Sequence, residues 1–514
     1  MPYVRTTWVD GSAPAIDAAG LNNIETGLVN IYAEVSAMET GGAAPGMVFA
    51  TPDAFAGIDP TGATNSASGL TAALAASANK TLLIPPGTYL VNSRITVTNQ
   101  SVRVSAHGAT FLCGNNSSTE GSIFRFTSTM GTTRSVSGVS EAITTDGRFG
   151  SNGENMWVTS LTCTTTPTGI AAGDWIKIAA DDLIADYQTG ARSGQFARVV
   201  EVSGNVVVVA GELRDPFTTN IRLAKVNAAK VTWEGGTFRA TDALLSGSTG
   251  VGSPLQFRWL LFPEVRSIHA DKLAGPFLDL RGCYGASASD VSANWLQDAS
   301  GSPGKYGYCV NDSSELSTIT RIKATRVRHA FTTGTTSVPA GNADLGNFGR
   351  SFGAMVMDGV CHGATQTSWD THGDADMTRF VNCQSHDSYS GFGLRGTNNA
   401  VIGGLIKGKH PGGACSVGTT SSSQNAYGSF FGGGLVLDGI ASAAAFWISR
   451  DNGGVESRPT YVDGVTIVNR DTTKYIIRAD YAAVGVGVVR VPAGGTRNSA
   501  TNGGTIVAMP TLSV

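Results

Sequence analysis

The sequence is short of charge and of long apolar runs. Only 15% of its 514 residues are Asp, Glu, Lys or Arg, against roughly 25% in an average soluble domain, and the net charge is −3. No basic stripe that would follow a phosphate backbone is visible, so we expect no nucleic-acid partner. No apolar run reaches the ~18 residues that a membrane-spanning helix needs, so we expect no membrane insertion. Hydrophobic residues still make up 41% of the chain, enough for a large core.

The chain also lacks paired cysteines. The seven Cys residues are scattered and none belongs to a C-x-x-C pair, which argues against a disulfide framework and a zinc knuckle. We expect them to be small buried apolar side chains. No His or Asp spacing matches a known metal-ligand pattern, so we predict no metal and no cofactor. The cysteines are Cys113, Cys163, Cys283, Cys309, Cys361, Cys383 and Cys415.

Glycine, by contrast, is abundant, with 66 residues, nearly twice the usual share of ~7%. Short Val, Ile, Leu and Phe runs alternate with Gly, Asn and Asp, as in TRFVNCQSHDS and GLVLDGI. This pattern is compatible with the coils of a β-solenoid, although no strict repeat length appears. An array of antiparallel sandwiches is the alternative.

Two ends and one insertion depart from that pattern. In residues 1–50 a heptad seam predicts a short trimeric coiled coil, with a helix packed on its own chain as the alternative. Residues 170–225 predict an inserted β-subdomain, with a hairpin turn at Ser203-Gly204-Asn205. Residues 471–514 predict strands and a polar tail that could clasp a trimer. The seam consists of Leu21, Ile24, Leu28, Ile31, Val35 and Met38.

The segment after residue 58 carries a family resemblance. DPTGATN, a helical stretch and IPPGTYLV resemble the opening of pectate-lyase-like right-handed parallel β-helix proteins, above all those of bacteriophage tails. TTWVDGSAPAIDAAGLNNIETGL is similar to the N-terminus of phage tail appendages. The resemblance implies an all-β, right-handed parallel β-helix over residues 51–470. It also implies a homotrimer on the virion tail, joined to other tail or baseplate proteins through residues 1–50.

Histidines indicate where chemistry could occur. Five of the seven lie between residues 329 and 410. Inside this window, the stretch WDTHGDAD places Asp370 and His372 two residues apart, on one face of an extended strand. Asp374 and Asp376 repeat the spacing after a glycine. Neighbouring coils lie ~4.8 Å apart, so Arg395 from the next coil can join the group.

Side chains around these residues predict a groove for sugars. Aromatic faces stack on sugar rings, and polar groups bind hydroxyls. RHAFTTG, WDTHGDAD and GFGLRG also resemble stretches of phage β-helix spikes, and the resemblance implies a groove that cleaves a bacterial surface polysaccharide. The candidate catalytic residues are Asp370, His372, Asp374, Asp376 and Arg395; the candidate substrate-binding residues are His329, Asp344, Trp369, His386 and Tyr389.

Two reactions fit this set. An inverting glycoside hydrolase needs two carboxyl groups ~6.5–9.5 Å apart, which two outward aspartates could supply. A polysaccharide lyase needs a base, here His372 or His329, and a cation, here Arg395. Neither polygalacturonase signatures nor a calcium-lyase signature is present, so the reaction stays open, with hydrolysis favoured over elimination.

Other interpretations remain for the same residues. Asp370 could cap a turn, His372 could be a structural hydrogen-bonding group, and Arg395 could form an ion pair on a ladder face. A spike that binds glycan without cleaving it, or a structural tail protein, would use the same fold.

Overall fold

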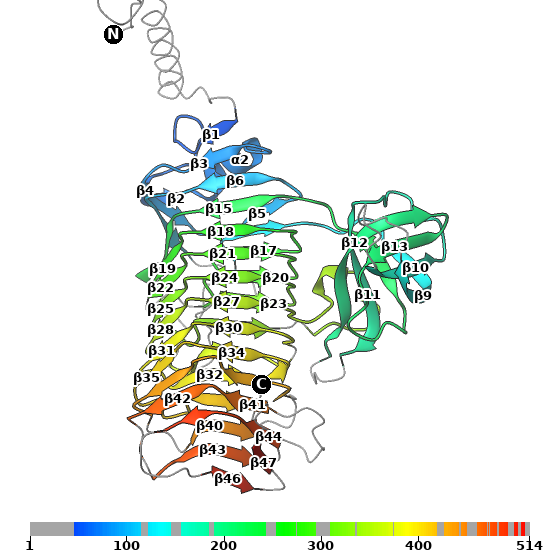
Figure 1. Cartoon of the computed structure of the whole chain (residues 1–514). Coiled ribbons are helices and arrows are strands. Elements are labelled where there is room, and N and C mark those ends of the chain that lie inside the picture. The colour runs from blue at the N-terminus through cyan, green and yellow to red at the C-terminus, as the bar shows by residue number, and fades with distance from the viewer. Residues whose placement is uncertain are drawn as a thin grey trace, which may run out of the picture.

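The structure is a computed structural model, and its described part is dominated by three long parallel sheets (Figure 1). It describes residues 46–114, 122–144, 156–184, 190–242, 253–273, 275–294, 309–334, 337–373, 375–418, 426–440, 444–449, 460–469, 471, 473–480, 483–491, 498–501 and 505–508. The predicted coiled coil lies outside these residues. Within them, no helix has the length and apolar character needed to cross a membrane.

The first sheet, called sheet A, faces the viewer in Figure 1. In spatial order its 14 described strands are β1 (Met47–Phe49), β3 (Thr81–Leu83), β6 (Val102–Ser105), β15 (Val231–Glu234), β18 (Glu264–Arg266), β21 (Ser287–Ser289), β24 (Thr318–Thr320), β27 (Met355–Met357), β30 (Arg379–Val381), β34 (Ala400–Ile402), β38 (Phe430–Gly432), β41 (Thr460–Asp463), β44 (Ala483–Val486) and β47 (Thr505–Ala508).

Sheet B is reached from sheet A by a short turn. Its 13 described strands are β2 (Thr61–Asn65), β4 (Gly87–Val91), β7 (Ala109–Cys113), β16 (Thr237–Ala240), β19 (His269–Asp271), β22 (Ser292–Asn294), β25 (Lys323–Thr325), β28 (Val360–His362), β31 (Gln384–His386), β35 (Leu405–Lys407), β39 (Val436–Asp438), β42 (Val465–Val468) and β45 (Val489–Arg490).

Sheet C completes each coil. Its 12 described strands are β5 (Ile95–Thr98), β8 (Phe124–Thr127), β17 (Leu255–Arg258), β20 (Leu278–Arg281), β23 (Cys309–Asp312), β26 (Phe331–Gly334), β29 (Thr367–Asp370), β32 (Ser390–Leu394), β36 (Cys415–Val417), β40 (Ala444–Ser449), β43 (Tyr475–Asp480) and β46 (Asn498–Thr501). A two-stranded pair, β33 (Gly396–Thr397) and β37 (Ala426–Tyr427), lies outside the three sheets.

Strands recur in the order A, B, C along the chain, and each pairs in parallel with its counterpart one coil away. The predicted parallel β-helix is therefore confirmed, and the sandwich array is excluded. Its core is a column of inward side chains in which aromatic rings stack from coil to coil, such as Phe126 on Phe257 with ring centroids 5.5 Å apart. All six cysteines whose side chains are described are buried and free, as expected.

The turns from sheet A to sheet B explain the glycine and asparagine content. Most of these turns contain residues with a positive φ, for example Asp358 at 54°, Asn382 at 52° and Gly403 at 67°. This conformation is unfavourable for most L-residues, and Gly and Asn tolerate it best. Asn382 Nδ2 also donates to Asp358 Oδ1 at 2.8 Å, so the turns of neighbouring coils are bonded to each other.

The helix α2 (Ala67–Ala76) covers the N-terminal end of the β-helix (Figure 1). It buries Leu70, Ala73 and Leu74 against the first coils. Because an open end of stacked strands exposes unpaired backbone groups and core side chains, such a cover protects against edge-to-edge association.

A closed antiparallel barrel projects from one side of the β-helix (Figure 1). The predicted hairpin is present, with Ser203 pairing with Val206. The predicted boundary at residue 170 was wrong, because the barrel starts at Arg134: strands of a parallel coil and of an antiparallel barrel show the same alternation. The barrel strands are β9 (Arg134–Thr144), β10 (Met156–Cys163), β11 (Trp175–Leu183), β12 (Arg192–Ser203), β13 (Val206–Ala210) and β14 (Arg222–Lys225).

The C-terminal region also differs from the expectation of a separate unit starting at residue 471. Its described strands, β43 to β47, extend the three sheets of the β-helix. Val, Ile and Ala alternate there as they do in the preceding coils, so the same core continues. A role in clasping a trimer stays a prediction.

Candidate functional site

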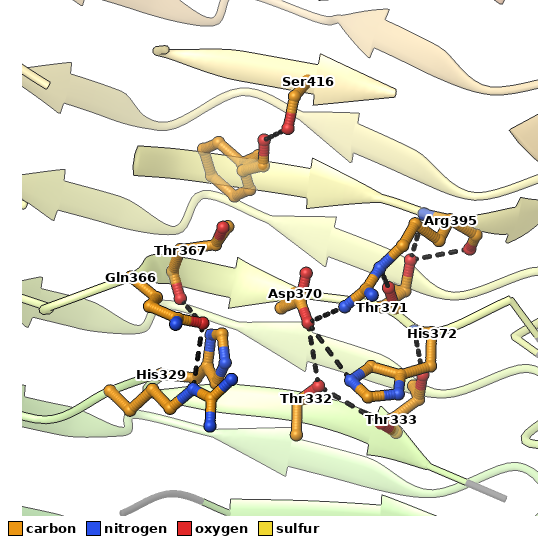
Figure 2. Close-up of polar contacts among 12 residues, drawn as sticks. His329, Thr332, Thr333, Gln366, Thr367, Asp370, Thr371, His372, Arg395 and Ser416 are labelled. Carbon is orange, nitrogen blue, oxygen red and sulfur yellow. Dashed lines mark hydrogen bonds and ion pairs between the residues drawn. The ribbon is translucent and has the colours of Figure 1, made fainter. Parts of the chain in front are cut away.

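The candidate site lies on the outer face of sheet C, where β26, β29 and β32 are neighbours (Figure 2). Phe331, Trp369 and Phe392 are in register and point into the core. Because side chains alternate along a strand, the next residue of β29, Asp370, points outward. We call Thr332, Asp370, His372 and Arg395 the Asp370 cluster.

Asp370 is the centre of this cluster. Its Oδ2 atom contacts Arg395 Nη2, lies 3.5 Å from His372 Nε2 and accepts a hydrogen bond from Thr332 Oγ1 at 3.2 Å. The residue is only 3% exposed. Burial by itself would raise the pKa of this carboxyl, but the positive charge of Arg395, followed by the two neighbouring histidines, outweighs it and lowers the pKa. Asp370 is therefore a fixed anion at neutral pH.

Arg395 is held in place by hydrogen bonds with Thr371 that involve both its side chain and its backbone. Arg395 Nε donates to the Thr371 carbonyl at 2.7 Å, and the Arg395 amide donates to Thr371 Oγ1 at 2.8 Å. Thr371 Oγ1 in turn donates to the Arg395 carbonyl at 2.8 Å. These three hydrogen bonds join two neighbouring coils and hold the Arg395 guanidinium against Asp370.

His372 follows the end of β29, and its backbone is fixed by a 2.7 Å hydrogen bond from its amide to Thr333 Oγ1. Its side chain is 25% exposed. Burial, together with the charge of Arg395, lowers the pKa of His372 to about 3 despite the opposing effect of Asp370. The imidazole is therefore neutral at physiological pH. With Nε2 turned to the carboxylate, Nδ1 is the nitrogen available as a base.

The predicted pairing of Asp370 with His372 and Arg395 is thus present, but Trp369 does not belong to the site. We expected its ring to stack on sugars, and this was wrong: Trp369 is fully buried, and its Nε1 donates to the Gln384 carbonyl at 3.0 Å. The alternation that turns Asp370 outward turns Trp369 inward.

His329 is also withdrawn from the surface. It is 3% exposed, and its Nδ1 lies 2.5 Å from the Thr367 carbonyl (Figure 2). Burial lowers its pKa to about 4. His329 is therefore too buried to contact a bound sugar, contrary to the substrate-binding role expected for it.

The two other predicted acids that are described, Asp376 and Asp344, do not join Asp370. Asp376 lies in the turn towards sheet A, where it accepts hydrogen bonds from Thr397 Oγ1 at 2.9 Å and Asn398 Nδ2 at 3.0 Å. Asp374 lies outside the described residues. Asp344 is exposed and precedes the short 3-10 helix η1 (Leu345–Asn347), in a loop that packs against the barrel. The i, i+2 pattern does not extend to Asp376 because β29 ends at Asp370.

His386 and Tyr389 fall on other surfaces. His386 is on sheet B, where its ring stacks on His362 with centroids 4.5 Å apart, in a groove of about 410 Å³ that Asp387 and Lys407 also line. Tyr389 is 53% exposed and lies before β32. No described contact links either residue to Asp370.

Sequence reasoning missed the threonines. Thr332, Thr333 and Thr371 position all three charged or titratable groups. Two of them come from a strand 37 or more residues earlier, and without the register of β26 against β29 nothing distinguishes them from other threonines. Within the described part of the chain, no three His, Cys, Asp or Glu side chains converge as metal ligands would.

No protein-family model matches the chain. Among solved structures, the tailspike protein gp49 of Pseudomonas phage LKA1 is similar, with a TM-score of 0.60 and 17% identity over 87% of this chain and 74% of that one. The tailspike gp61 of Pseudomonas phage phi297 is similar with a TM-score of 0.64 and 14% identity, over 85% and 69% of the two chains. At these identities the likeness establishes the fold.

Proposed function

We propose that this protein is a bacteriophage tailspike that binds and cleaves a bacterial surface polysaccharide at the Asp370 cluster. The β-helix that it shares with the two tailspikes and the similarity of its first residues to phage tail appendages support the tail role. The observation that carries the cleavage proposal is the convergence of a carboxylate, a neutral imidazole and a guanidinium on one outer face.

The lowered pKa of Asp370 argues against the hydrolysis that the sequence favoured. A hydrolase needs a carboxyl with a raised pKa as general acid, and the pKa of Asp370 is lowered. Asp376, the nearest other described acid along the chain, is bonded into a turn. The Asp370 cluster therefore contains a base and a cation but no second carboxyl.

In the proposed reaction, His372 Nδ1 removes the proton on the carbon next to a uronate carboxylate. The electron pair forms a carbon–carbon double bond, and the glycosidic C–O bond to the leaving sugar breaks. Arg395 stabilises the negative charge that develops on the uronate, and Asp370 stabilises the imidazolium that forms. The proton then passes from the imidazole to the leaving oxygen or to water.

The test uses a panel of purified bacterial capsular and O-chain polysaccharides. Elimination would give shorter fragments together with new ultraviolet absorbance from the unsaturated sugar ends. His372→Gln is expected to remove both signals by a factor of 100 or more, because positioned acid–base groups contribute about 10²–10⁴-fold. Shorter fragments without ultraviolet absorbance would contradict elimination and support hydrolysis. Binding of intact glycan without fragments would support a purely adhesive spike.

We also propose that three chains assemble, with residues 1–50 attached to other tail or baseplate proteins. The heptad seam supports this assembly. Light scattering of the full chain should give three times the 52.9 kDa chain mass. A monomer at micromolar concentration would contradict it.

A further inference from the structure

A second site candidate lies where the barrel meets the β-helix. A cleft of about 240 Å³ opens between them. Trp175, Gln195 and Arg214 line it from the barrel side, and Tyr284, Glu315 and Phe352 line it from the β-helix. It is therefore separate from the Asp370 cluster.

The walls of this cleft are aromatic and only half-buried. The Trp175 and Tyr284 rings lie 4.4 Å apart between centroids, at an angle of 45°. The guanidinium of Arg214 lies 3.9 Å from the centre of the Phe352 ring. Aromatic rings that keep part of their surface exposed offer contact area at a low cost in side-chain entropy, while the polar edges give orientation.

Arg214 has a buried donor that the described residues do not satisfy. Its Nη2 donates to Glu315 Oε2 at 2.7 Å and its Nε to Gln195 Oε1 at 3.2 Å. Its Nη1 is buried, yet no hydrogen-bond partner for it exists in the described part of the chain. Leaving a buried charged group's N–H unpaired is unfavourable, so this donor favours a ligand oxygen in the cleft.

The cleft lies along a corner of the β-helix that continues to the coil of the Asp370 cluster. Tyr284, Glu315, Phe352 and Asp376 form successive parallel bridges, one per coil, between sheets C and A. Asp376 belongs to the same coil as Asp370, six residues further along the chain. Adjacent coils are ~4.8 Å apart, so a linear polymer that follows this corner passes both sites.

We propose that the cleft is a second glycan-binding subsite, which holds the polysaccharide on the N-terminal side of the Asp370 cluster. This inference rests on the proposed polysaccharide function. A pyranose unit packs against Trp175 and Tyr284, and one of its hydroxyl or carboxylate oxygens accepts the hydrogen bond from Arg214 Nη1. The barrel is then a wall of the substrate groove as well as an appended domain.

The test fills the cleft without touching its ion pairs. Ala210 lines the cleft at the end of β13, and Val206 lies on the same face of that strand about 13 Å away. Ala210→Trp is expected to raise the Kd for a polysaccharide of the panel that the wild type binds by about tenfold or more, the effect of losing ~1.4 kcal/mol of binding. Val206→Trp, the matched control, should bind as the wild type does.

A second variant separates loss of a ligand contact from loss of structure. Tyr284→Phe removes one hydroxyl at the cleft and keeps the ring, so we expect a severalfold weaker affinity and an unchanged melting temperature. His372→Gln should lose cleavage but keep the cleft, and therefore a measurable affinity. If Ala210→Trp and Tyr284→Phe bind as the wild type does, the subsite is refuted while the proposed function stands. If the wild type binds none of the panel, both proposals fail.

Discussion

At the scale of single residues, the charge state of the Asp370 cluster depends on burial and on one cation. Asp370 and His372 both lie in a poorly hydrated position, yet only the carboxyl stays ionised, because Arg395 compensates its burial and opposes protonation of the imidazole. Low hydration disfavours the charged form of both groups, and the positive charge of Arg395 favours the carboxylate over the imidazolium. Asp370 is therefore an anion and His372 a neutral base.

Asp370→Asn tests the role of the negative charge on Asp370. We expect cleavage to fall by a factor of 100 or more and the free energy of unfolding to fall by about 1–3 kcal/mol, because Arg395 loses its anion. Rate assays on a cleaved polysaccharide and urea unfolding measure the two effects. Asp271→Asn, a carboxyl of sheet B that accepts one hydrogen bond from Asn294, should change neither by much. Full activity of Asp370→Asn would remove the residue from the mechanism.

The buried histidines predict how stability depends on pH. The pKa of His329 is lowered to about 4 from an ordinary value near 6.5. Between these two pKa values, His329 is protonated in the unfolded chain and neutral in the folded chain. The free energy of unfolding therefore falls as the pH falls from about 6.5 to about 4. His372 acts in the same direction.

His329→Asn keeps a donor for the Thr367 carbonyl but removes the titrating ring. Between pH 7 and pH 5 the wild type should lose on the order of 2 kcal/mol more of its unfolding free energy than this variant does. Urea unfolding at both pH values measures the difference. Equal losses would show that His329 titrates normally in the folded protein.

At the scale of elements, the tight turns from sheet A to sheet B control how closely coils stack. Gly404 has φ 98°, and a Cβ there would lie 2.1 Å from the Cys383 carbonyl oxygen of the preceding coil. Gly434 occupies the corresponding turn of the next coil at φ 89°, and a Cβ there would have nothing within 4 Å. The two glycines share a backbone conformation and differ in the space around them.

Alanine at the two positions separates these effects. Both variants strain the backbone, and Gly404→Ala also forces two coils apart, so we expect it to be about 1–3 kcal/mol less stable than Gly434→Ala. Melting temperatures of the two variants, measured side by side, give the comparison. Equal losses would mean that only the backbone angle matters.

At the scale of the whole molecule, the barrel is held on the β-helix by a buried carboxylate. Glu315 accepts hydrogen bonds from Lys177 Nζ at 3.1 Å, Arg214 Nη2 at 2.7 Å and the Phe196 amide at 2.9 Å, all from the barrel. Lys177 is fully buried. Arg350 adds a second link, a two-bond pair with Asp215. A buried charge has to be paired, so these contacts fix one orientation of the two units.

Glu315→Gln removes the shared anion. We expect a loss of about 3–5 kcal/mol, because Lys177 is left as an unpaired buried charge, and faster hydrogen exchange in β11 and β12. Asp290→Asn, which breaks an exposed pair with Arg321, should cost less than about 1 kcal/mol. Unchanged exchange in the barrel of Glu315→Gln would show that apolar contacts alone hold it.

Several features followed from local sequence. Short apolar runs with Gly and Asn at turns predicted the coils, and Asp370 and His372 could be placed on one face because strand alternation is a local property. Other features depended on which strands of different coils are neighbours in space. The threonines of the site, the burial of Trp369 and His329, the withdrawal of Asp376, and the extent of the barrel all depend on pairing partners tens of residues away.

The sequence by itself therefore determined the kind of coil and one outward Asp–His pair, since both arise from interactions between near neighbours in the chain. Only the tertiary structure decided that Arg395 keeps Asp370 ionised, that His372 is neutral, and that the barrel and the β-helix enclose a cleft. These depend on inter-coil register and on burial, which no stretch of residues specifies alone.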